Sequence, residues 1–274
     1  MTREHEIEDH DRGLDVDIRT LADRRLVLGM IGGAGLALVA ACAPSSAGGS
    51  AAPSAPASTG ASEPARADVA EIPEETAGPY PGDGSNGPNA LTESGIVRGD
   101  IRPSFGTATG VAEGIATTVT LNVLDAGTAE PLKGAAVYLW QCDRDGNYSM
   151  YSQGAENENY LRGVQETDAG GTVVFTTIFP ACYSGRWPHM HFEVYESLAE
   201  ATRAGTKLVT SQLAIPRGIC ETVYATSGYE RSVGNLARVS LDRDMVFSDG
   251  HDSQLATVTG GVPAGIGVSL DVGV

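Results

Sequence analysis

The sequence predicts a mainly β protein, a β-sandwich of short strands with few short helices. After residue 95, segments rich in β-branched and aromatic residues recur, and their apolar and polar positions alternate. Turn sequences built from Gly, Pro and Asp separate these segments. Helical periodicity is weak throughout the same region, which disfavours a helical bundle or an alternating α/β architecture.

The expected strands follow one another at short intervals along the chain. Turns at 131–134 and 168–171 lead into two of them, because both contain the Gly or Asp residues that such turns require. Two short helices are expected, at 197–204 and 219–225. In chain order, the expected strands are 96–101, 117–123, 135–141, 172–177, 189–195, 207–213, 239–241 and 268–272.

The first 41 residues are predicted to be an export signal. Arg24-Arg25 precede an uncharged run, 26–41, that is too short and too rich in small residues to span a membrane. The arginine pair is typical of a twin-arginine signal, which carries folded proteins. The run ends in Val39-Ala40-Ala41-Cys42, which resembles a lipobox whose cysteine receives lipid. A simple cleaved signal with an unmodified cysteine is the alternative.

The rest of the chain divides into a tether and a single domain. Residues 42–70 consist largely of Ala, Ser, Pro and Gly, so they cannot bury enough apolar surface to offset their ordering entropy. Residues 71–274 have the length of one domain with a substantial core. We therefore expect an extracytoplasmic domain that touches the membrane only through a lipid on Cys42.

The chain is strongly acidic, with a net charge of −17. From Cys42 onward it has 13 basic and 27 acidic residues, a net charge of −14. Such a surface argues against nucleic acid or anionic lipid head groups as partners. It does not identify a substrate or an oligomeric state.

The most informative motif lies at 177–191. It places Tyr183, Arg186, His189 and His191 within nine residues. On a β-strand, His189 and His191 project from the same face, where two imidazoles can share one metal ion. A surface strand with two solvated histidines is the alternative interpretation.

Upstream, the expected strand 135–141 runs into an Asp-Gly turn and then Tyr148. Tyr151 and Tyr160 are nearby, but neither follows that turn. Two tyrosines and two histidines make chemical sense as one ligand set, because phenolates are hard anionic donors that favour a trivalent metal, and imidazoles suit iron, copper or zinc. An Fe(III) ion would activate an organic substrate, and a catechol can chelate it through two adjacent hydroxyls.

These motifs resemble those of the intradiol ring-cleavage dioxygenases, the family of catechol 1,2-dioxygenase and protocatechuate 3,4-dioxygenase. The resemblance spans most of 71–274, which would be the catalytic domain. It rests on Thr76-Ala77-Gly78-Pro79-Tyr80, on the segment 139–148, on Leu161-Arg162-Gly163, and on the block 177–191. The chain is most similar to secreted members, because a signal and a tether replace the helical N-terminal region of cytoplasmic catechol enzymes.

The resemblance implies Fe(III) held by Tyr148, Tyr183, His189 and His191. Tyr183 matches the ligand that leaves when a catechol chelates the metal, so it is also the candidate base. Arg186 matches an arginine that stabilises negative charge on the substrate, and Gln212 matches a glutamine near the substrate. The implied partners are a small aromatic diol and O₂, and the implied product of cleavage between the hydroxyl-bearing carbons is a cis,cis-muconate-type diacid.

Other interpretations are open. Arg186 and Trp187 could form a surface cation–π pair, and Gln212 could be an ordinary polar strand residue. The whole domain could be a non-catalytic transthyretin-like β-sandwich that binds a ligand or cell-wall material and keeps a relict metal site. A hydrolase with a histidine base is disfavoured, because the sequence has no Gly-x-Ser-x-Gly elbow.

Four cysteines are present: Cys42, Cys142, Cys182 and Cys220. No Cys-x-x-Cys pair occurs, so a cysteine-rich zinc site is poorly supported. With Cys42 taken by lipid, one internal disulfide can form. We predict that it joins Cys182 and Cys220, pins the corner that carries Tyr183, and leaves Cys142 free.

Export and anchoring are tested separately in the full-length chain. Replacing Arg24 and Arg25 by Lys is expected to block export, and Cys42→Ala is expected to move the protein from the membrane fraction to the soluble one. Cell fractionation with immunoblotting measures both. A Cys42→Ala variant that stays in the membrane fraction would contradict the lipid anchor.

Overall fold

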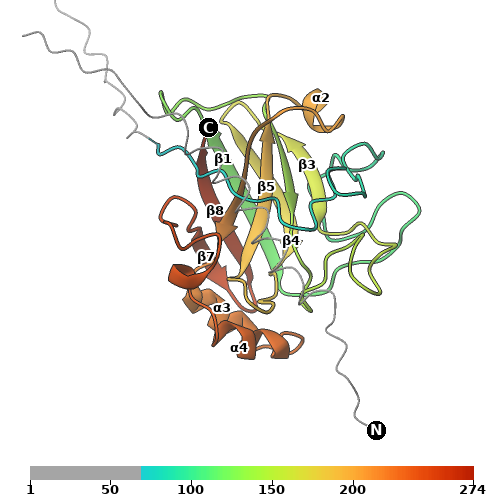
Figure 1. Ribbon diagram of the computed structural model, residues 1–274, viewed down its shortest axis with the longest axis vertical. Coiled ribbons are helices and arrows are strands. Elements are labelled where there is room, and N and C mark those ends of the chain that lie inside the picture. The colour runs from blue at the N-terminus through green and yellow to red at the C-terminus, as the bar shows by residue number, and fades with distance from the viewer. Residues whose placement is uncertain (1–68) are drawn as a thin grey trace, which may run out of the picture.

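The computed structural model describes residues 69–274 (Figure 1). The predicted export signal, Cys42 and most of the predicted tether lie outside the described residues. Within the described part, none of the helices has the length and apolarity needed to cross a membrane. The body of the domain consists of two four-stranded sheets and a few short helices, so the predicted mainly β fold is confirmed.

The first sheet has the order β4-β1-β8-β7. Its central strand β1 is antiparallel to β4 and parallel to β8. Along β1, buried and more exposed residues alternate, so one face of this sheet meets the core and the other meets water. The strands of this sheet are β1 (Ala116–Leu124), β4 (Thr172–Ile178), β7 (Thr257–Gly261) and β8 (Gly265–Gly273).

The second sheet has the order β3-β2-β5-β6, and all its strands are antiparallel. Its two central strands are buried along their whole length, so this sheet is covered on both faces. Its strands are β2 (Ala136–Trp140), β3 (Arg162–Glu166), β5 (His189–Tyr195) and β6 (Lys207–Ala214).

The two faces of β5 belong to different layers. Met190, Phe192 and Val194 point into the core between the sheets. The residues between them point the other way, toward a second apolar cluster that packs over the outer face of the sheet. Loops before β1 and after β2 supply much of that cluster, including Leu91, Ile96 and Tyr148.

Three short α-helices and one 3₁₀ turn follow β5. α3 (Arg217–Tyr224) and α4 (Glu230–Leu236) lie together at one end of the sandwich, and α2 (Leu198–Ala201) lies at the opposite end (Figure 1). The expected helix 197–204 is shorter than predicted, because Ala204 adopts a positive φ of 51° and ends the helical stretch. α4 was not predicted.

The strand predictions were correct for six of the eight expected segments. The segment 96–101 is not a strand but a crossing: Val97 bridges to β3 in one sheet and Asp100 bridges to β4 in the other. The segment 239–241 leads instead into the 3₁₀ turn η2 (Leu241–Arg243). The strands β3 and β7 were missed, because Gly and charged residues weaken their β signal.

The predicted Cys182–Cys220 disulfide is wrong, because Cys142, Cys182 and Cys220 are all free and buried. The thiol of Cys182 points to the carbonyl of Arg186, at 3.5 Å, while that of Cys220 points to the carbonyl of Ile215, at 3.8 Å. Each sulfur is therefore directed into local backbone and not toward the other cysteine. Burial also raises the pKa of Cys182 to about 12, which suppresses its reactive thiolate.

The first segment of the described domain contains a buried carboxyl, Glu75, whose titration is expected to make the stability of the fold depend on pH. Burial, and then the nearby Asp249, raise the pKa of Glu75 from 4.5 to about 7. The folded state therefore holds this proton more tightly than the unfolded state does, and folding loses stability as the pH rises from about 4.5 through 7. Glu75→Gln is expected to raise the free energy of unfolding by roughly 1 to 2 kcal/mol at pH 8.5 and to have little effect at pH 4.5.

Urea unfolding at both pH values measures this difference. Glu71→Gln, at an exposed position of the same segment, is the matched control. A Glu75→Gln variant with the same change in unfolding free energy at both pH values would contradict the prediction.

Candidate metal centre

The four predicted metal ligands meet on the outer face of the second sheet. His189 and His191 come from β5, where His191 pairs with Trp140 of β2 on one side and Gln212 of β6 on the other. Tyr148 lies in the loop after β2, and Tyr183 in the connection from β4 to β5. Three separate parts of the chain thus deliver the four side chains.

The donor atoms of these side chains form a closed ring. Tyr148 Oη lies 3.3 Å from His191 Nε2 and 3.5 Å from Tyr183 Oη. Tyr183 Oη lies 3.2 Å from His189 Nε2. The two Nε2 atoms are 3.1 Å apart, which closes the ring.

Both histidines are neutral in this setting. His189 and His191 are 2% and 3% exposed, and burial lowers the pKa of each well below 6.5. The Arg186 guanidinium lowers the pKa of His189 further. His189 Nδ1 donates to the carbonyl of Trp187, so its Nε2 presents a lone pair to the ring, as a metal ligand must.

The rings around His191 hold it in place. Trp140 stacks on it with centroids 4.9 Å apart and an interplanar angle of 10°. Its Nδ1 is buried and has no hydrogen-bond partner among the residues that the structure describes. The polar contacts of this imidazole with the described residues are made by Nε2, which faces the other donors.

A tight turn places Tyr148. The carboxylate of Asp143 accepts hydrogen bonds from the backbone N–H groups of Asp145 and Asn147, both at 2.9 Å. Gly146 has a φ of +91°, and a Cβ there would approach the Cβ of Tyr183 to 3.2 Å. The Asp-Gly sequence thus allows the two tyrosine loops to pack closely.

Helix α4 holds the loop of Tyr183. Ser232 Oγ accepts a hydrogen bond from the Cys182 N–H at 3.0 Å, and Asn235 Nδ2 donates to the Cys182 carbonyl at 2.8 Å. Both backbone groups of the residue before Tyr183 are therefore satisfied by one helix. Tyr183 itself stays partly exposed, whereas Tyr148 is only 2% exposed.

Arg186 and Gln212 lie beside the ring of donors. Arg186 is 2% exposed, and its Nη2 donates to Gln212 Oε1 at 2.7 Å. Its Nη1 lies 3.5 Å from His189 Nε2. Trp187 packs beneath a different cation, Arg217, so the expected alternative of an Arg186–Trp187 surface pair is not what the structure contains.

Tyr151, Tyr160 and the third histidine of the described residues, His251, lie away from the ring of donors. Tyr151 Oη donates to Asn86 and accepts from the Gly82 N–H, both at 2.8 Å. Tyr160 Oη donates to Asp143 at 3.2 Å. His251 contacts the backbone of its own loop.

Two residues at the centre were not predicted from the sequence. Asp244 is buried and forms an ion pair with Arg186, with Nε and Oδ2 3.1 Å apart. Trp140 forms a wall through its stack on His191. Trp140 could have been found from the sequence, because it lies in the strand that leads to Tyr148. Asp244 could not, because a single Asp in a turn has no local pattern that distinguishes it.

The donor set fits a metal ion. Ligand atoms about 2.0 to 2.2 Å from one metal, at angles of roughly 90 to 110°, lie about 2.8 to 3.6 Å apart. The four separations in the ring fall within that range. The described residues contain no cluster of three or more His, Cys, Asp or Glu side chains suited to a metal, so a four-ligand set at this place would have to include the two tyrosines.

The anionic form of the tyrosine side chains would be stabilised by a nearby cation. Burial, and then the neighbouring Tyr183, raise the pKa of Tyr148 well above 10. Arg186 lowers this pKa in part, and a metal cation at the centre of the ring would favour the Tyr148 phenolate further, most strongly if it were trivalent.

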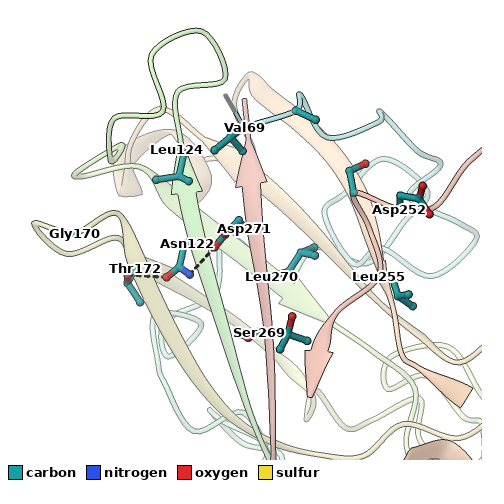
Figure 2. Close-up of a pocket in the computed structure, with 13 residues that line it drawn as sticks. Val69, Asn122, Leu124, Gly170, Thr172, Asp252, Leu255, Ser269, Leu270 and Asp271 are labelled. Atoms are coloured by element: carbon teal, nitrogen blue, oxygen red, sulfur yellow. Dashed lines mark hydrogen bonds between the residues drawn. The ribbon is translucent and has the colours of Figure 1, made fainter. Parts of the chain in front are cut away.

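A separate cleft of about 880 Å³ lies on the other sheet (Figure 2). Residues of β1 and β8 line it, and Asn122 joins Asp271 and Thr172 across three strands by hydrogen bonds of 2.8 and 2.9 Å. None of the predicted site residues lines this cleft.

Iron retention tests the ring directly. Tyr148→Phe is expected to weaken Fe(III) binding by roughly 100-fold or more, since even the hydrogen-bond partners of metal ligands contribute about 10- to 100-fold. Equilibrium dialysis with metal analysis measures the loss. Tyr151→Phe, which removes a hydroxyl outside the ring, is the matched control, and equal retention in both variants would exclude Tyr148 as a ligand.

Comparisons with known proteins agree with the resemblance in the sequence. Residues 89–207 match the family model described as Dioxygenase. An intradiol ring-cleavage dioxygenase from Tetranychus urticae has a similar structure, with a TM-score of 0.58 and 25% identity over 74% of this chain and 94% of its own. A second dioxygenase structure gives a TM-score of 0.60 and 25% identity over 75% and 94%. None of the curated proteins matches the chain.

Proposed function

Because the chain resembles the intradiol ring-cleavage dioxygenases in its family match and its fold, we propose that it is a non-haem Fe(III) dioxygenase. Its reaction would cleave a catechol-type ring between the two hydroxyl-bearing carbons and incorporate both atoms of O₂, giving a cis,cis-muconate-type diacid. The observation that carries the proposal is the closed ring of two phenol and two imidazole donors.

The residues that would hold the iron are Tyr148, Tyr183, His189 and His191. When bound there, Fe(III) would supply a Lewis acid that a catechol could chelate through its two hydroxyl oxygens, and would favour the reaction of the aromatic ring with O₂. Imidazoles kept neutral by burial and phenols that become anionic beside a cation suit a trivalent ion.

The two tyrosines differ in what they can do. Tyr148 is enclosed at 2% exposure, with Tyr80 packed against its ring at a centroid distance of 5.0 Å. Tyr183 is partly exposed and stands on a loop, so its phenol has more room to move. We assign Tyr183 Oη as the base that accepts a proton from a catechol hydroxyl.

Arg186 would stabilise negative charge that develops on the substrate ring. Its guanidinium is buried beside the donor ring, where low water content strengthens electrostatic interactions. Gln212 accepts a hydrogen bond from this guanidinium and donates to the carbonyl of Thr76 at 2.8 Å. Gln212 would therefore help to shape the substrate site from β6.

The proposed place of action is outside the cytoplasm. It rests on Arg24-Arg25, the uncharged run 26–41 and the lipobox-like Cys42. A lipid on Cys42 would keep the domain on the outer face of the membrane, with the segment 42–70 as a tether.

The purified domain loaded with Fe(III) is expected to be coloured, because phenolate-to-iron charge transfer absorbs visible light. Anaerobic addition of catechol is expected to shift the band. Arg186→Ala is expected to keep the iron and its colour but to lower kcat by roughly 10²- to 10³-fold, because its charge acts on the substrate. Visible spectra and oxygen uptake with catechol, protocatechuate, hydroxyquinol and chlorocatechols measure these effects.

A matched control is Arg203→Ala, which removes an exposed arginine of the turn after α2. It is expected to leave kcat within about twofold of the unmodified protein. A colourless protein that stays inactive on all these catechols after iron loading would favour the alternative, a non-catalytic binding module with a relict site.

A further inference from the structure

The buried guanidinium of Arg186 is held from two directions. Its Nε donates to the carboxylate of Asp244, at 3.1 Å from Oδ2 and 3.4 Å from Oδ1. Its Nη2 donates to Gln212 Oε1 at 2.7 Å. Because a guanidinium is planar, two such contacts set the direction of the third nitrogen, Nη1, which lies 3.5 Å from His189 Nε2.

The carboxylate of Asp244 is itself fixed by backbone groups. Its Oδ2 accepts from the Trp187 N–H at 2.6 Å, and its Oδ1 accepts from the Val246 and Phe247 N–H groups at 2.9 and 3.4 Å. The side chain is fully buried. These bonds keep the acceptor in place before any substrate arrives.

The glutamine on the other side is equally constrained. Gln212 is 0% exposed, and its Nε2 donates to the carbonyl of Thr76 at 2.8 Å. A carbonyl can only accept, so the amide nitrogen must face Thr76 and the amide oxygen must face Arg186. Both acceptors for the guanidinium thus have defined orientations.

Charge balance gives Asp244 a second effect. An unpaired cation at 2% exposure would be strongly disfavoured, and one carboxylate in direct contact offsets most of that cost. The backbone contacts alone would hold the loop at 244–247. The hydrogen bond from Arg186 Nε to Asp244 has a different effect, because it links the position of that loop to the orientation of the Arg186 guanidinium.

We propose that Asp244 is a positioning residue for the dioxygenase reaction: it aims Nη1 of Arg186 at the substrate side of the donor ring. This inference rests on the proposed function. It extends the candidate site to the turn after η2, a segment that no sequence motif marked. Asp244 acts through Arg186 and does not itself touch the donor atoms.

Asp244→Asn keeps the shape of the side chain but removes its charge. It also turns one acceptor into a donor, so the side chain cannot accept both from Arg186 and Trp187 on one side and from the Val246 N–H on the other. We expect kcat for catechol to fall roughly 10- to 100-fold, with KM changed less than about threefold. In the Arg186→Ala background the same substitution is expected to change kcat by no more than about twofold, because its target is already gone.

A positioning role and a general loss of stability are separated by a matched variant. Val119→Ala removes buried methyl groups from β1 in the other sheet and lowers stability without touching the site. It is expected to leave kcat within about twofold. Thermal unfolding of both variants shows whether their stability losses are comparable.

The orientation of Arg186 can also be measured without iron or turnover. In the metal-free protein, the Nε–H resonance of Arg186, identified by its loss in Arg186→Ala, is expected to exchange slowly with water. Asp244→Asn is expected to speed that exchange at least about tenfold. The exchange rate in the unsubstituted protein tests the proposal even if Asp244→Asn fails to fold.

The outcomes distinguish the two proposals. Rapid Nε–H exchange in the unsubstituted protein, or Asp244→Asn and Arg186→Ala effects that multiply, would overturn the positioning role and leave the dioxygenase proposal standing. A protein inactive on every catechol would overturn the proposed reaction and this inference together.

Discussion

The burial of β5 on both faces is the constraint on which the rest of the site depends. Its inner face supplies Met190, Phe192 and Val194 to the core, so its other face must carry His189 and His191. A covering layer of loops excludes water from those imidazoles. Buried polar nitrogens need partners. The two Nε2 atoms contact each other and the two tyrosine hydroxyls, and His189 Nδ1 donates to the carbonyl of Trp187.

The same covering layer governs the electrostatics. Burial lowers the pKa of both histidines and raises the pKa of the Tyr148 phenol, so none of these three donors carries a positive charge that would oppose a cation. The buried guanidinium of Arg186 nearby is paired with Asp244. In surroundings of low dielectric, a fixed cation beside the ring acts strongly on any charge that develops there.

The two sheets differ in how they are covered, and the candidate site lies on the covered one. The first sheet has one face toward water, and in its cleft Asn122 is hydrogen-bonded to Asp271 and Thr172 (Figure 2). The second sheet is covered, and its cover brings Tyr148 to the site. Helix α4 adds the last support, because Ser232 and Asn235 clamp the residue before Tyr183. The candidate site therefore depends on the covered sheet, its covering loops and helix α4.

The sequence by itself determined the strands with strong alternation and the grouping of His189 with His191, because both depend on local period-two geometry. Tyr148 and Tyr183 were predicted through a resemblance, and only the tertiary structure decided that their hydroxyls reach the same ring. It alone decided that the buried cysteines stay free and that Asp244 reaches Arg186. The contacts of Tyr148 with Tyr183 and of Asp244 with Arg186 join residues 35 and 58 positions apart, and no local pattern encodes which distant side chains will meet.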